Sequence, residues 1–261
     1  MSYRRIAVFG GVYSNYLALA ATLEDARQRE VDALFCLGDL GGFGPYPDRV
    51  YPLLRDAGVQ VMRGNYDISL AEGLTDCGCG YTDPRDNYYA ALSYEYTFHN
   101  TSEENRRWLG TLPDVLRVQL GNYRLHMCHG SPRQVNEFMW ESTTPDGFLG
   151  KLCQDYDAEV LLFTHTGIKW HRRLPGDRHA VNVGVIGRPE NDGGTQVWYA
   201  LLTAEPALEV VFVPVQYDYE ALAIDMREEG LPEAFVETIR SGWWTSCLEV
   251  LPGKERAGGR W

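Results

Sequence analysis

Polar side chains stand directly after several apolar segments of this chain, where they could act together. Four of them are metal-binding types: Asp39, Asn65, His129 and His165. They supply a carboxylate oxygen, an amide oxygen and two imidazole nitrogens. This mixture favours Zn²⁺, Mn²⁺ or Fe²⁺ over Ca²⁺ or Mg²⁺. The sequence therefore predicts one divalent transition-metal site, and the alternative is a polar cluster that holds no metal.

The apolar segments before these residues read as buried strands. Strands are predicted over residues 4–9, 33–37 and 59–62, with helices between them that begin near Ser14 and Pro47. This order is typical of a mostly parallel sheet with helices on its faces. Ligands bind beyond the carboxyl ends of the strands in such sheets, so residues distant in sequence should meet at one edge.

The rest of the chain mixes helices and strands. Thr101 and Glu104 form a predicted capping box, and Gly121–Asn122 joins a predicted hairpin. The other expected elements, in chain order, are a helix over 85–98, hairpin strands over 115–120 and 123–128, a helix from Thr144–Pro145, strands over 160–163, 169–174, 179–183, 196–202 and 208–215, and helices over 219–229 and 232–241.

Composition excludes several classes of function. The 261 residues carry a formal net charge of -12, with 44% hydrophobic and 23% charged residues, as in a globular protein. Binding to nucleic acid or to acidic membranes is not expected, because no extended basic face is present. No segment approaches the roughly 20 apolar residues of a membrane helix, and the N-terminus lacks a signal-peptide core. We therefore expect a cytoplasmic protein.

The strings around the four polar residues are distinctive. They read CLGDLGGFGP, MRGNYD, CHGSP and FTHTG, and NVGVIGRP follows them. In this order they resemble the motifs of the calcineurin-like metallophosphoesterases. The string DCGCGYTDP is similar to one found in a bacterial and archaeal branch of small phosphoesterases. The resemblance covers roughly residues 6–242.

The resemblance implies an α/β fold of four layers, an α/β/β/α sandwich of two mixed sheets flanked by helices. Residues 1–242 would form this domain, with the C-terminal helices included as a cap. Residues 243–261 are expected to be a loose tail, because they end in Gly, Lys and Arg.

The resemblance also implies a two-metal centre, of which only one half is present. The ligand set of one ion is intact as Asp39, Asn65, His129 and His165. The three residues that would bind only the other ion are missing, because Gly11, Tyr13 and Gly167 stand in their places. We interpret this selective loss as a change of function. Restoring Gly11→Asp, Tyr13→His and Gly167→His together is expected to raise activity on a phosphate ester.

Other residues near these motifs have both a functional and a structural interpretation. Gly10–Gly11 could bring backbone amides to an anion. Tyr13 is expected to fill the space that the missing metal and its ligands would occupy. For Tyr66, filling space and contacting a phosphate are equally favoured interpretations. Cys77 and Cys79 form either a metal or redox pair or a simple Gly-rich turn. Arg133 is a candidate for phosphate binding and is more simply a surface residue.

Three hypotheses for function remain open. The first is a divergent phosphoesterase that uses one metal ion on a phosphate-bearing small molecule, with Asp39, Asn65, Tyr66 and His129 as catalytic residues. The second is a non-catalytic protein of the same fold that binds a ligand or serves as a scaffold, as a homo-oligomer or with a protein partner. The third is another hydrolysis or lyase reaction at the remodelled centre.

Overall fold

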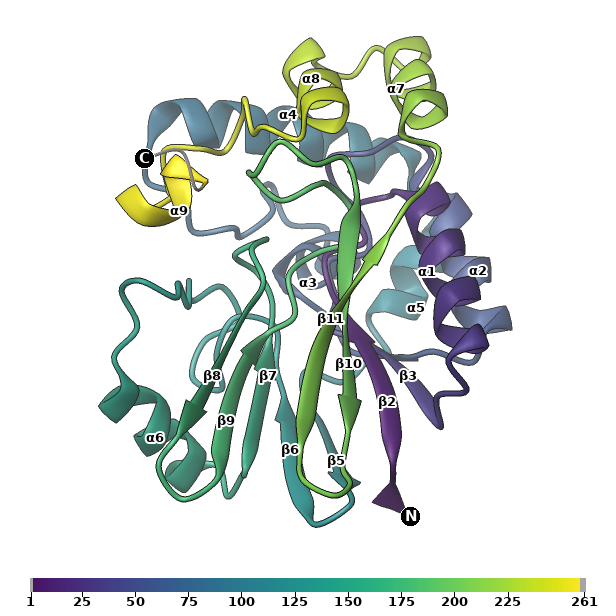
Figure 1. Cartoon of the computed structure of the whole chain (residues 1–261). Helices are drawn as coiled ribbons and strands as arrows, with labels where there is room; N and C mark the ends of the chain where they lie inside the picture. The colour runs from purple at the N-terminus through teal and green to yellow at the C-terminus, as the bar shows by residue number, and fades with distance from the viewer. Residues whose placement is uncertain (1, 259–261) are drawn as a thin grey trace.

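Two mixed β-sheets form the centre of the computed structural model, which describes residues 2–258 (Figure 1). The five-stranded sheet has the order β11 (Glu209–Val215), β10 (Val197–Thr203), β2 (Arg5–Phe9), β3 (Ala33–Cys36) and β4 (Gln60–Val61). The six-stranded sheet has the order β1 (Ser2–Tyr3), β5 (Leu116–Leu120), β6 (Tyr123–Met127), β7 (Val160–Phe163), β9 (Arg178–Asn182) and β8 (Trp170–Leu174).

The two sheets pack face to face through apolar side chains. On β2, Ile6 and Val8 point into the core between the sheets, whereas Ala7 and Phe9 belong to a second core on the outer face. Met127 and Leu162 contribute to the inter-sheet core from the other sheet. Strands buried on both faces read as continuous apolar runs, which is why these segments were recognisable in the sequence.

Helices cover both outer faces and complete the four-layer sandwich (Figure 1). On one side lie α1 (Tyr16–Gln28) and α2 (Val50–Asp56), and on the other lies α6 (Asp146–Asp155), which packs Leu149 and Leu152 against β7. The other helices are α3 (Asn65–Glu72), α4 (Pro84–Asn100), α5 (Glu103–Leu109), α7 (Tyr219–Glu228), α8 (Glu233–Ser241) and α9 (Gly253–Ala257). Figure 1 shows α4, α7 and α8 above the carboxyl ends of the strands. No helix among the described residues is long and apolar enough to cross a membrane.

Two predicted helix starts were wrong by one residue. Asn15, not Ser14, caps α1 by accepting a hydrogen bond from the backbone of Ala18 at 2.9 Å. Ser102, not Thr101, caps α5, where it accepts from the backbone of Asn105. In both places neighbouring polar residues compete for the cap, and tertiary contacts select between them.

The expectation of a loose tail was also wrong for the part of residues 243–261 that the structure describes. Trp244 is 3% exposed and Leu251 is 5% exposed, and both join an apolar cluster with Trp140. Glu255 on α9 accepts hydrogen bonds from the backbone and hydroxyl of Ser142. Two apolar anchors, Trp244 and Leu251, therefore outweigh the polar composition of this segment. Its residues 259–261 lie outside the described part.

One buried side chain fixes the turn after β7. Asn182, the last residue of β9, donates from Nδ2 to the Thr164 carbonyl at 3.1 Å and to the Thr166 hydroxyl at 2.8 Å. Its Oδ1 accepts from the Gly184 backbone at 3.0 Å. The turn that carries His165 is therefore held by two hydrogen bonds from one fully buried amide, which also accepts one from the loop after β9.

We predict that Asn182→Ala lowers the free energy of unfolding by about 2–4 kcal/mol, because it leaves the buried Gly184 N–H without a partner and removes two hydrogen bonds to the turn after β7. Urea denaturation measures this change. Asn122→Ala, at the exposed hairpin turn, is the control and should stay within about 0.5 kcal/mol of the parent protein. Equal stabilities for the two variants would contradict this role of Asn182.

Candidate metal centre

The four predicted ligand residues follow four strands that end at the same edge of the sandwich. Asp39 lies after β3, and Asn65 opens α3 directly after β4. His129 and His165 follow β6 and β7 of the other sheet. The sequence did not reveal that a helix begins at Asn65, because the polar residues after Gly64 do not repeat with a clear helical period. This helix places Asn65 and Tyr66 in its first turn.

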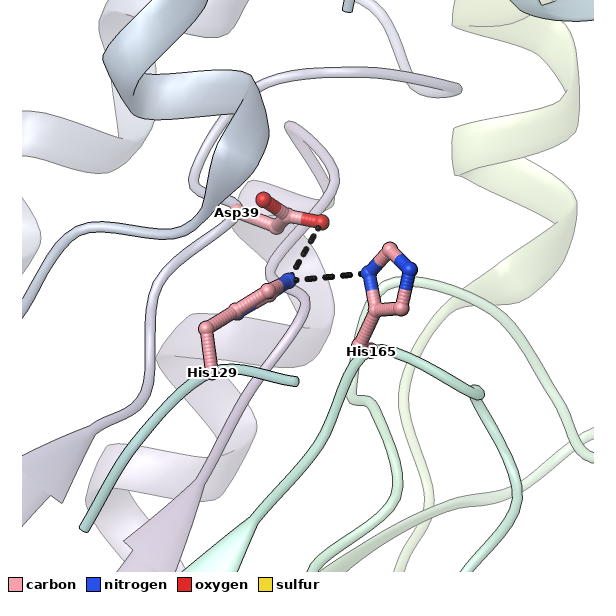
Figure 2. A group of neighbouring side chains, drawn as sticks. All are labelled: Asp39, His129 and His165. Carbon is pink, nitrogen blue, oxygen red and sulfur yellow. Dashed lines mark hydrogen bonds and ion pairs between the residues drawn. The ribbon is translucent and has the colours of Figure 1, made fainter. Parts of the chain in front are cut away.

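Three of these side chains converge closely, as Figure 2 shows. His129 Nε2 lies 3.1 Å from Asp39 Oδ2 and 3.2 Å from His165 Nδ1. One potential ligand atom from each residue lies within 4.8 Å of the other two, and all three residues are buried. An imidazole nitrogen facing both a carboxylate and another imidazole needs a cation between them, either a proton or a metal ion.

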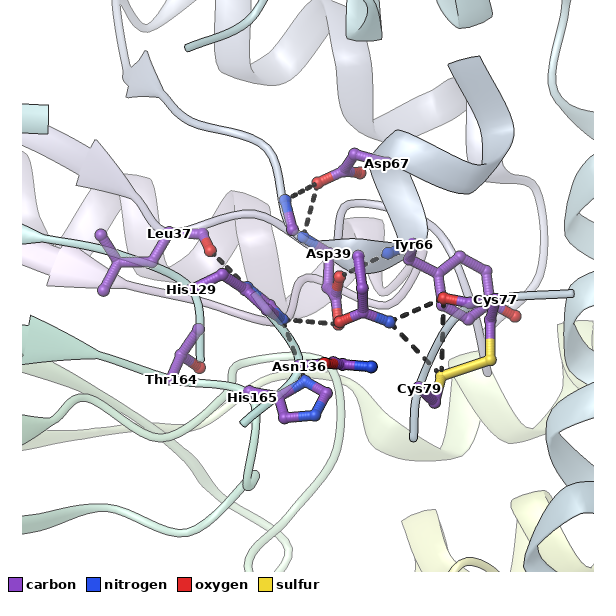
Figure 3. Close-up of polar contacts among 12 residues, drawn as sticks. Leu37, Asp39, Tyr66, Asp67, Cys77, Cys79, His129, Asn136, Thr164 and His165 are labelled. Atoms are coloured by element: carbon purple, nitrogen blue, oxygen red, sulfur yellow. Dashed lines mark hydrogen bonds and ion pairs between the residues drawn. A yellow bond between two sulfur atoms is a disulfide. The ribbon is translucent and has the colours of Figure 1, made fainter. Parts of the chain in front are cut away.

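Backbone contacts hold these side chains in place (Figure 3). His129 Nδ1 lies 2.7 Å from the Leu37 carbonyl, so it donates there and leaves Nε2 to face the other residues. Asp39 Oδ1 accepts from the Tyr66 backbone at 3.1 Å. The Asp67 carboxylate accepts from the backbones of Asp39, Leu40 and Gly64, and thereby ties the loop after β3 to the start of α3.

Gly64 is required by the close approach of these groups. A Cβ atom at this position would lie 2.3 Å from Asp39 Oδ1 and 2.7 Å from the ring of His129. No other residue would fit without moving a candidate ligand.

Asn65 supplies the fourth polar group. Its Nδ2 donates to the Cys77 carbonyl at 2.8 Å, and the network thereby assigns Oδ1 as the free atom. This Oδ1 is buried and has no hydrogen-bond partner among the described residues. A buried amide oxygen without a partner is rare in folded proteins and fits a ligand that the structure does not contain. The donor set therefore fits a divalent transition metal.

Burial and mutual charge set the protonation of the cluster. Burial alone would raise the pKa of Asp39, but the charge and hydrogen bond of His129, together with His165 and the Tyr66 backbone, outweigh burial and lower that pKa. Burial alone would lower the pKa of His129, but the charge and hydrogen bond of Asp39, with smaller contributions from its other neighbours, raise it above its ordinary value. Burial and then the nearby His129 lower the pKa of His165 to about 3. At neutral pH His165 is thus a neutral imidazole, the form that binds metals.

The space beside Gly11 and Gly167, where the resemblance implied the ligands of a second ion, is filled. Gly11 has φ +50°, and a Cβ there would lie 2.3 Å from Val185 Cγ1 and 3.0 Å from the ring of Tyr13. At Gly167, with φ +82°, a Cβ would lie 2.9 Å from the ring of Trp244. The structure thus supports the expectation that Tyr13 fills space.

The anion site expected at Gly10–Gly11 is not supported. The Gly11 backbone N–H donates to the Gly38 carbonyl at 2.9 Å. The N–H groups of Tyr13 and Ser14 donate to the carbonyls of Asp39 and Leu40. These amides are therefore committed to holding the two loops together and are not free for an anion.

Asp39 and His165 line a pocket with a largely aromatic wall, which includes Phe43, Tyr66, Tyr81, Tyr89 and Phe235. Burial keeps the pKa of Tyr66 far above its ordinary value, and its hydroxyl lies 2.9 Å from Ser93 Oγ. The Tyr66 phenol therefore stays protonated and fixed at the pocket wall.

The structure separates the other candidate residues. Cys77 and Cys79 are joined by a disulfide across Gly78, and the Cys77 carbonyl positions Asn65. Arg133 pairs with Glu137 and is half exposed, as the favoured interpretation of a surface residue expects. Arg188, which sequence reasoning missed, is a buried cation in the pocket wall. Its only sequence signal was its place inside the NVGVIGRP string.

Known proteins are similar to this chain over nearly its whole length. An uncharacterized protein of Methanocaldococcus jannaschii is 25% identical over 252 residues, which cover 91% of this chain and 98% of that protein. The crystal structure of a metallophosphoesterase from Sphaerobacter thermophilus is 26% identical, with a TM-score of 0.70, and covers 92% of this chain and 100% of that chain.

A second solved structure supports the fold alone. A hypothetical protein from Pyrococcus horikoshii is 24% identical, with a TM-score of 0.77, and the match covers 94% of this chain and 100% of that chain. The family model of the calcineurin-like phosphoesterase superfamily domain matches residues 5–206. These residues include both sheets except β1 and β11, and they include all four candidate ligands. The chain therefore belongs to the calcineurin-like phosphoesterase superfamily.

Proposed function

We propose that this protein is a phosphoesterase that hydrolyses a phosphate ester of a small molecule with one divalent transition metal ion. The observation that carries the proposal is the convergence of Asp39, His129 and His165 on one point beside a pocket. Asn65, with its unpartnered Oδ1, is the fourth proposed ligand. Elemental analysis of the purified protein distinguishes Zn²⁺, Mn²⁺ and Fe²⁺ as the bound ion.

One ion, rather than two, is favoured by the closed side of the centre. Tyr13 and Trp244 occupy the space beside Gly11 and Gly167, and neither glycine carries a ligand atom in its side chain. Asp39 would then bind a single ion as a terminal ligand. Its second oxygen is already engaged by the Tyr66 backbone.

The roles of the protein's own groups follow from their contacts. The Leu37 carbonyl fixes the tautomer of His129, and the Cys77 carbonyl turns the amide oxygen of Asn65 away from itself. The Tyr66 hydroxyl can donate a hydrogen bond to an oxygen of the phosphate ester. A bound divalent ion would lower the pKa of a water molecule and offset negative charge on the phosphate.

A non-catalytic ligand-binding or scaffold protein is the second candidate. One observation favours it: with His129 protonated, the Asp39–His129 pair is satisfied by a hydrogen bond of 3.1 Å. The cluster could therefore persist as a buried ion pair with a structural role. Metal content separates the two candidates directly.

The one-metal proposal predicts about one equivalent of Zn, Mn or Fe per purified chain, measured by elemental analysis. His129→Ala and His165→Ala should each reduce metal content severely, because each removes a ligand. His99→Ala, at an exposed position, is the matched control and should keep it. Two equivalents in the parent protein would contradict a single site, and none would favour the non-catalytic candidate.

Hydrolysis of 4-nitrophenyl phosphate tests catalysis, with release of nitrophenolate as the measurement. We expect activity that depends on the metal and falls by about 10²–10³ or more in His129→Ala. Tyr66→Phe should reduce the rate by less, because it removes one hydrogen bond and keeps the metal ligands. A metal-loaded protein that cleaves neither this monoester nor the corresponding diester would be inconsistent with a general phosphoesterase.

The structure revises the expectation that restoring the missing ligands raises activity. Gly11→Asp and Gly167→His place side chains at positive φ and against Val185 and Trp244. We expect each to lower the free energy of unfolding by at least about 1 kcal/mol, and the triple variant with Tyr13→His to gain no second metal equivalent. Thermal unfolding and metal analysis measure this. A stable triple variant with two ions would show that the closed side opens readily.

A further inference from the structure

Arg188 is a buried arginine without an anionic partner. It is 6% exposed, its Nε is buried with no hydrogen bond, and none of the described carboxylates forms an ion pair with it. Its guanidinium instead lies over the ring of Trp244, 3.5 Å from the ring centroid. Contact with an aromatic face offsets only part of the lost hydration of a cation. The uncompensated charge needs an anion.

The guanidinium belongs to the same pocket as the candidate metal ligands. Arg188 lines this pocket together with Asp39 and His165. A Cβ atom built on Gly167, two residues after His165, would lie 3.5 Å from Arg188 Nη2. Asp39, the only carboxylate among the described lining residues, is already engaged by His129 and by the Tyr66 backbone. The pocket therefore has a free cation and no free anion.

The position of Arg188 is fixed from both sides. The backbones of Ile186 and Gly187 donate to the carbonyls of Gly10 and Gly11 at 3.0 Å and 2.7 Å. The Trp244 indole donates to the Pro189 carbonyl at 2.8 Å, and the Trp244 backbone donates to Asn191 Oδ1 at 3.0 Å. The ring against which the guanidinium lies is thus held by the segment that carries Arg188. Such preorganisation lowers the entropic cost of binding a ligand.

We propose that Arg188 is the anion-binding residue of this pocket and binds a phosphoryl group beside the candidate metal centre. The substrate class is therefore a phosphate ester whose phosphoryl group carries at least one negative charge. This inference rests on the proposed function for the identity of the anion, but the binding of phosphate is testable without catalysis. A planar guanidinium can donate two parallel hydrogen bonds to phosphate oxygens, which an ammonium group cannot do.

Titration calorimetry with inorganic phosphate tests the subsite on the full chain, first freed of metal with a chelator and then reloaded, at constant ionic strength. Arg188→Met should weaken phosphate binding roughly tenfold to a hundredfold, because charge-assisted hydrogen bonds are lost while the apolar stem remains. Arg188→Lys should lie between the two. Arg173→Met, which removes an exposed arginine paired with Asp177, is the control and should bind as the parent does.

The outcomes separate this inference from the proposed function. Arg188→Met should take up as much metal as the parent protein, because no candidate ligand is changed. Phosphate binding that depends on Arg188 in a protein without phosphatase activity would support the subsite and count against catalysis. Equal phosphate affinity for the parent and Arg188→Met in both metal states, or no binding to the parent in either, overturns the subsite. If circular dichroism shows that the Met variant is unfolded, Arg188→Gln is judged by the same criteria.

Discussion

The hydrogen bond between His129 Nδ1 and the Leu37 carbonyl joins the two sheets at the edge where the candidate site lies. Leu37 and Asp39 follow a strand of the five-stranded sheet, whereas His129 and His165 follow strands of the six-stranded sheet. The cluster therefore exists only while the sheets stay packed through the apolar core between them. A small shift of one sheet would separate the Asp39 carboxylate from the imidazoles of His129 and His165. The four-layer fold is in this sense the support of the site.

The centre is asymmetric in its packing as well as in its residues. On one side, polar groups are oriented by backbone carbonyls and Asn65 Oδ1 is left unpartnered, as a ligand site requires. On the other side, the ring of Tyr13 lies against Gly11 and Gly187, and Trp244 lies against Gly167. Because protein interiors are close-packed, the space beside Gly11 and Gly167 must be occupied by other side chains. Here the groups that fill the space are aromatic, and the guanidinium of Arg188 lies against one of them, the ring of Trp244.

The C-terminal segment links this asymmetry to the rest of the fold. Trp244 is anchored by Pro189 and Asn191, and the Asp86 carboxylate on α4 accepts from the backbones of Glu249 and Val250. The segment thus ties α4 to the loop after β9. A polar, glycine-containing sequence can be well packed when a few large apolar side chains and buried hydrogen bonds hold it. Composition alone could not show this, because it does not reveal where the anchors dock.

The sequence by itself determined the strand order along the chain, the family and the four polar residues at strand ends, because apolar runs and short local motifs carry that information. It placed most elements within a residue or two. It missed β1 and α9, and it missed α3, whose polar first turn has no clear period. Only the tertiary structure decided that Asp39, His129 and His165 meet, that Arg133 pairs with Glu137, and that Arg188 is a buried cation without an anion. Burial, partners and free space depend on contacts between residues far apart in the chain, and no local pattern encodes them.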